Sequence, residues 1–99
     1  MAYTDGVVNV SLESRLALDP HARFRRVGEE GVLVQQSSAE VLVINDTAAR
    51  LIELSDGTRT LADCAGLIEA DFEVQRQTIE GDLLRFAEEL IAAGVAKLS

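Results

Sequence analysis

Cysteine, histidine and aromatic residues are scarce in this chain of 99 residues. It contains one cysteine (Cys64), one histidine (His21), no tryptophan, one tyrosine and three phenylalanines. A lone cysteine excludes a disulfide within the chain, which agrees with a reducing compartment. One histidine is too few for a His/Cys metal cluster, and a catalytic Ser/His/Asp set would depend on that single residue. The sequence also lacks a glycine-rich phosphate loop. We therefore expect no metal, no cofactor and no enzymatic activity.

Basic residues and long apolar runs are also in short supply. Lys and Arg number 9 against 17 Asp and Glu, which gives a net charge of −8. Nucleic-acid binding depends on cationic side chains, so a nucleic-acid partner is not expected. No segment is apolar for long enough to cross a bilayer, and the N-terminus lacks the basic start and apolar run of a secretory signal. We expect a cytoplasmic protein without a membrane partner.

The apolar content of 47% suits a single compact domain. Residues 1–19 hold one short alternating run, Val8, Val10 and Leu12, which predicts an N-terminal arm or an extra strand. The domain itself is expected over residues 20–99.

Its first half has the pattern of three strands. Alternation predicts strands at Arg23–Val27, Val32–Gln35 and Val41–Ile44, with turns at 29–31 and 36–38. Such closely spaced runs are typical of an antiparallel meander, in which the third strand lies at an edge.

From Asn45 the apolar period changes to that of a helix. Asn45 is a suitable N-cap for a first helix from about Asp46 to Leu54, and Asp56-Gly57 is expected to end it. Thr60, followed three residues later by Asp63, resembles a capping box for a second helix that reaches about Ala70.

A third, longer helix is predicted around Ile79, Leu83, Phe86 and Leu90, with Gly94 as its stop. Residues 95–98 are compatible with either a short final strand or an apolar tail. The predicted class is α+β, a three-stranded antiparallel meander followed by three α-helices.

The stretch Val41–Ile44 is apolar on both faces, which is unusual for a strand with one side in water. It also lacks the lysines, prolines or bulges that protect edge strands. Two explanations remain open. The N-terminal run around Val8 covers this edge, or an extended peptide from another molecule adds to it as a strand.

The third helix bears on the same choice. Beyond its main stripe it carries Leu84, Ala87 and Ile91, an apolar arc wider than one packed interface requires. The spare width is compatible with simple core packing or with the wall of a groove beside the third strand.

The runs GVLVQQSSAEVLVINDTAARLIELSDGTRTL and DLLRFAEELIAAGV resemble the PqqD-like family, the recognition elements that hold precursor peptides for modifying enzymes. The likeness extends over about Pro20 to Leu98. It implies a winged-helix-like fold without catalytic activity, in which the leader segment of a ribosomally made precursor adds beside the third strand and packs against the third helix. It also implies a modifying enzyme, such as a radical SAM protein, as a partner.

Carried over residue by residue, the resemblance gives a set of peptide-binding positions on the strand and the helix. These are Val41, Leu42, Val43, Ile44, Leu83, Leu84, Ala87 and Ile91.

Two other functions remain as alternatives. A winged-helix regulator of nucleic acids needs a basic start to its recognition helix, whereas this helix has Glu80 and Asp82 there. An oligomerisation module would pair the exposed edge with a second copy, so a homodimer is a further possibility.

Overall fold

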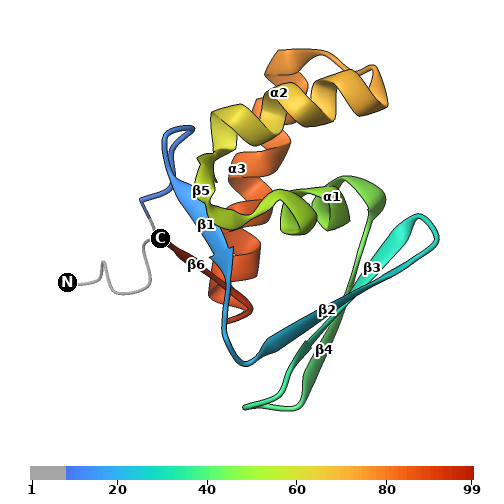
Figure 1. Ribbon diagram of the computed structural model, residues 1–99, viewed down its shortest axis with the longest axis vertical. Helices are drawn as coiled ribbons and strands as arrows, with labels where there is room; N and C mark the ends of the chain where they lie inside the picture. Colours follow the sequence, from blue (N-terminus) through green and yellow to red (C-terminus); the bar gives the residue numbers. More distant parts are fainter. Residues whose placement is uncertain (1–8) are drawn as a thin grey trace.

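The computed structural model describes residues 9–99, which form two three-stranded antiparallel sheets and three helices (Figure 1). Six strands and three helices follow one another in the order β1 (Arg15–Leu18), β2 (Ala22–Val27), β3 (Glu30–Gln35), β4 (Glu40–Ile44), α1 (Asp46–Leu54), β5 (Asp56–Thr60), α2 (Leu61–Phe72), α3 (Arg76–Ala92) and β6 (Ala96–Leu98). The α+β class, the meander and the three helices predicted from the sequence are confirmed.

The first sheet is the predicted meander, in the order β2-β3-β4. Its first turn differs from the prediction, because Gly28 and Glu29 make the turn while Glu30 and Gly31 belong to β3. Gly28 has a φ of +61°, which a two-residue hairpin loop favours and which glycine adopts without strain. The predicted turn at 29–31 therefore starts one residue and ends two residues too late.

The second sheet, in the order β5-β1-β6, was largely missed. Its central strand lies at Arg15–Leu18, whereas the extra strand was expected near Val8–Leu12. Residues 9–12 are not a strand, although Val10 and Leu12 pack on the core, and Val8 lies outside the described residues. Asp56-Gly57 ends α1 but also begins β5, and a final strand was one of the two alternatives for residues 95–98.

Side-chain caps explain where the first two helices begin. The Asn45 side chain accepts a hydrogen bond from the Ala48 N–H at 2.9 Å. Thr60 and Asp63 form the predicted capping box, with reciprocal bonds of 3.0 and 3.1 Å. The second helix continues two residues beyond the predicted Ala70, to Phe72.

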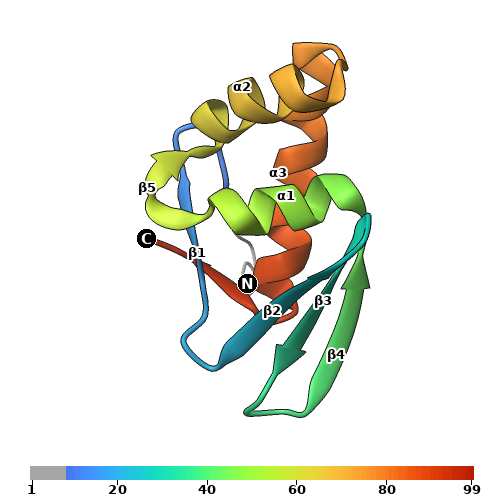
Figure 2. The ribbon, with the colours of Figure 1, turned by 45° about the vertical axis from the view of Figure 1, so that its right-hand side comes forward.

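One hydrophobic core joins the two sheets to the three helices. Figures 1 and 2 show α3 running between the sheets, with α1 packed across it. The largest side chains that are almost completely buried come from strands, from all three helices and from the segment after α3; they are Leu16, Leu33, Leu51, Leu61, Ile68, Leu83, Val95 and Cys64. This shared core fixes the position of β4 relative to α3.

Candidate functional site

The fourth strand leaves one edge of the meander open. It pairs with β3 from Gly31↔Ile44 to Gln35↔Glu40, and no strand within residues 9–99 pairs with its other side. Figure 2 shows β4 as the outermost strand of its sheet. The main-chain groups along such an edge are a template for another extended chain.

The two faces of β4 have different surroundings. Leu42 and Ile44 lie on the inner face, partly buried against the core. Val41 and Val43 lie on the outer face, where 62% and 64% of their surface is exposed. Within residues 9–99 the protein therefore covers the inner face of β4 and leaves Val41 and Val43 on the outer face exposed.

A pocket of about 190 Å³ lies beside the inner face of this strand. It is lined by residues from β4, α1 with its cap, and α3: Val43, Ile44, Asn45, Ala48, Phe86, Glu89 and Leu90. Phe86 and Leu90 are four residues apart, so they lie on one face of α3 one turn from each other. The short side chain of Ala48 leaves the space between α1 and this face. The pocket is of a size and character to hold one apolar side chain.

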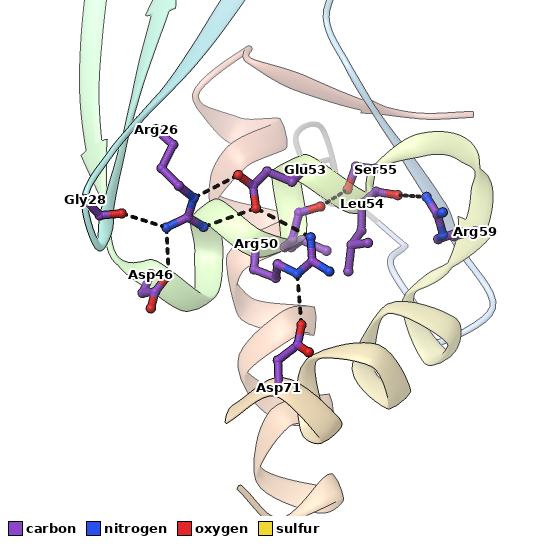
Figure 3. A network of polar contacts seen from close by, with 10 residues as sticks. Arg26, Gly28, Asp46, Arg50, Glu53, Leu54, Ser55, Arg59 and Asp71 are labelled. Carbon is purple, nitrogen blue, oxygen red and sulfur yellow. Dashed lines mark hydrogen bonds and ion pairs between the residues drawn. The ribbon is translucent and has the colours of Figure 1, made fainter. Parts of the chain in front are cut away.

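An ionic network holds α1, and so one wall of the pocket, against the meander (Figure 3). Arg26 of β2 donates to Asp46 Oδ1 at 2.8 Å and to Glu53 Oε2 at 2.8 Å. It also donates to the Gly28 carbonyl at 3.1 Å. The hydrogen bond from Arg26 is the main cause that lowers the pKa of the Glu53 carboxyl. Arg50 extends the network to α2 through Asp71 at 3.1 Å.

The predicted strand positions Val41, Leu42, Val43 and Ile44 all lie on the open strand, and the last two line the pocket. The predicted helix positions lie elsewhere. Leu83 and Ala87 are fully buried in the core, each with 0% of its surface exposed. Such side chains have no accessible surface for a ligand to contact.

Leu84 and Ile91 are partly buried against the core, outside the pocket lining. The helix face that borders the pocket instead carries Phe86, Glu89 and Leu90, which are not among the predicted site residues. Phe86 and Leu90 were recognised as part of the apolar stripe. Because this stripe is broad, the sequence alone does not indicate which side of the helix faces β4.

Nothing in the described part of the chain forms a metal site or a reactive thiol. Residues 9–99 contain no group of three or more metal-ligating side chains. Burial raises the pKa of the Cys64 thiol, which therefore stays protonated in the core, as expected for a packing residue. None of the described helices combines the length and apolar character needed to cross a membrane.

Comparison with known proteins identifies a family whose sequence model matches most of the chain. The sequence model of coenzyme PQQ synthesis protein D (PqqD) matches residues 30–96. No curated protein matches the chain.

Three solved structures share the fold. The PqqD truncation of Methylobacterium extorquens PqqCD, described as a stand-alone recognition element for ribosomally synthesised and post-translationally modified peptides, has a TM-score of 0.77 at 21% identity and covers 90% of this chain and 95% of its own. A lasso peptide synthetase B1 complexed with its leader peptide has a TM-score of 0.73 at 26% identity and covers 84% and 98%. TbiB1 in complex with the TbiA(beta) leader peptide also has a TM-score of 0.73, at 18% identity, and covers 82% and 94%.

A recognition element binds a peptide and does no chemistry of its own, which agrees with the expectation of a non-catalytic protein. The sequence match extends from the start of β3 to the start of β6 and therefore includes the open strand and every residue of the pocket. The chain belongs to the PqqD family.

Proposed function

We propose that the protein binds the leader segment of a ribosomally synthesised precursor peptide as an added strand along β4. In this role it is an adaptor that presents the rest of the precursor to a modifying enzyme. The observation that carries the proposal is the open edge of β4 directly beside an apolar pocket. The leader peptide bound by the 26% identical lasso peptide synthetase B1 supports the same class of ligand.

The meander has a second edge strand, β2, but its chemistry does not favour an added peptide. Its sequence ARFRRV carries three arginines, and charged side chains are a common protection of sheet edges. On β4 only Glu40, at the first position, is charged. The pocket also adjoins β4. Both differences favour β4 as the binding edge.

A bound strand would place alternate side chains on the inner face, toward Ile44, Phe86 and Leu90. Full burial of one apolar side chain contributes roughly 1.5–3 kcal/mol. Main-chain hydrogen bonds to β4 add register and further affinity. After the cost of ordering the peptide, binding on the order of micromolar is expected.

The proposal is tested by titrating isotope-labelled protein with a synthetic leader peptide from the precursor gene nearest to its own gene. Amide NMR signals of Val41–Ile44 should shift, because their main-chain groups acquire new partners. The Val43→Lys variant places a charge on the outer face of the open strand, beside the added peptide, and should weaken binding about tenfold or more. Since Val43 is 64% exposed, its stability should change little.

Val27→Lys is the matched control, because Val27 is 55% exposed on β2, the opposite edge of the same sheet. It should leave peptide affinity unchanged. Equal weakening by the two variants, or peptide-induced shifts confined to β2, would contradict the proposal.

The enzyme partner follows from the same role. The resemblance suggests a radical SAM protein or another modifying enzyme, which co-purification with the tagged adaptor and its leader tests. An oligomerisation module would instead pair β4 with a second copy, and sedimentation at increasing concentration would then reveal a dimer that the leader peptide does not dissociate.

A further inference from the structure

One acidic side chain lies in the otherwise mainly apolar lining of the pocket. Glu89 is exposed, one turn before the end of α3, and borders the pocket together with Phe86 and Leu90. Within residues 9–99 no cationic side chain forms an ion pair with it. Glu88 beside it is likewise unpaired in this range but does not line the pocket, whereas Asp46 pairs with Arg26 at 2.8 Å and Asp82 pairs with Arg85 at 3.3 Å.

The position of Glu89 is unfavourable for the helix that carries it. The C-terminal end of a helix bears a partial negative charge, and α3 has no basic residue in its last turn to balance it. A carboxylate in that turn adds a like charge. Glu89 therefore destabilises the helix. A destabilising carboxylate at this position has a reason if it binds a ligand.

A second carboxylate, that of Glu40, lies at the start of β4. Glu40 pairs across the ladder with Gln35, whose side chain is 7% exposed, so both side chains belong to the inner face of the sheet. Gln35 in turn donates to the Gly94 carbonyl at 2.7 Å, just after α3. The C-terminal end of α3 thus points toward the Glu40 end of β4. The inner face of β4 thus carries Glu40 at its start, followed by the apolar side chains of Leu42 and Ile44.

We propose that the leader recognised by this protein is cationic, an inference that rests on the proposed function. The leader inserts one apolar side chain into the pocket. Two positions away it carries a Lys or Arg that pairs with Glu89. Side chains two positions apart in a strand share a face and lie roughly 7 Å from each other, within reach of a long basic side chain. An acidic residue at that position would be repelled by Glu89 and by the partial negative charge at the C-terminal end of α3. The net charge of −8 attracts the same cationic peptides from a distance.

The test uses phage-displayed random decapeptides, panned in parallel against the wild-type protein and the Glu89→Lys and Glu88→Lys variants. Glu88 is also exposed near the end of α3 but does not line the pocket, so it is the matched control. Wild-type and Glu88→Lys proteins should enrich Lys and Arg over Asp and Glu about two- to fivefold near the apolar anchor. The Glu89→Lys protein should reverse this preference.

Thermal unfolding supplies a second readout. Both lysine variants should unfold at a higher temperature than wild type, because each replaces a carboxylate near the C-terminal end of α3 with a cation. Only Glu89→Lys should also change peptide selection. Peptides that shift the β4 amide signals without any charge preference, or with the same preference in all three proteins, would overturn the inference and leave the proposed function standing. If no selected peptide shifts those signals, the proposed function fails and the inference fails with it.

Discussion

Gly31 and Gly81 differ in how much space surrounds them. Gly31 lies in β3 where the strand passes close to α1, and a Cβ there would come within 2.6 Å of Phe24 Cε1 and 3.0 Å of Ala49 Cβ. Gly81 lies within α3, and a Cβ there would meet nothing within 4 Å. The first glycine is required by packing, whereas the second only weakens its helix.

Alanine at these two positions should therefore act in opposite directions. Gly31→Ala is expected to destabilise the protein by about 1–3 kcal/mol, because the ring of Phe24 and the start of α1 must move apart. Gly81→Ala is expected to stabilise it by about 0.5–1 kcal/mol. Urea unfolding of the two variants measures both values. A neutral Gly31→Ala variant would mean that β3 and α1 are less tightly packed than the structure describes.

At the scale of elements, the link between β2 and α1 is ionic and so depends on pH. Hydrogen bonding from Arg26 keeps the pKa of the Glu53 carboxyl below its ordinary value, so the folded state favours the charged form. A lowered folded-state pKa stabilises the protein at pH values above the unfolded value of about 4.5, and this contribution is lost as the pH falls through the lower folded value.

Glu53→Gln should remove this contribution. Its Tm at neutral pH should fall by about 2–6 °C, and its Tm should decline less than that of wild type between about pH 5 and pH 3. Differential scanning calorimetry across this range is the measurement. The control is Glu29→Gln in the exposed first turn, where the profile should follow wild type. Parallel profiles for wild type and Glu53→Gln would show that the network does not contribute.

Some of the strands and helices could be predicted from the sequence, and others could not. The meander and the first two helix starts are encoded locally, by alternation in Val32–Gln35 and by the caps Asn45 and Thr60, so they could be predicted. The second sheet could not be predicted in full. β1 has four residues and pairs with segments from the middle and the end of the sequence, so its pairing depends on tertiary contacts.

The same limit applies to the candidate site. The open strand was predictable because its unprotected apolar sequence is visible in Val41–Ile44. The helix side was not, since the apolar arc of α3 includes Leu83 and Ala87 on one flank and Phe86 and Leu90 on the other. The rotation of a helix about its axis is set by what it packs against. Here the core buried Leu83 and Ala87 and left Phe86 facing the strand.

At the scale of the whole molecule, the shared core predicts that the two sheets unfold together. Leu33 of β3 is 0% exposed and belongs to the same cluster as Leu16 of β1. Leu33→Ala should cost about 2–5 kcal/mol, a large part of the stability expected for a domain of this size. Urea unfolding followed by circular dichroism and by NMR signals from each sheet should give coincident transitions. Val27→Ala is the control at an exposed position, and its free energy of unfolding should stay within about 0.5 kcal/mol of the wild-type value. Separate midpoints for the two sheets would contradict a single cooperative unit.

The strand order β5-β1-β6 also constrains how the protein is made in the cell. Arg15–Leu18 is translated before both strands with which it pairs, and its second neighbour is available only when Ala96–Leu98 has emerged from the exit tunnel. The open strand β4 is therefore translated well before the domain can close around its core. During that interval Val41–Ile44 is an apolar segment without its core, so pairing with other unfinished chains competes with folding.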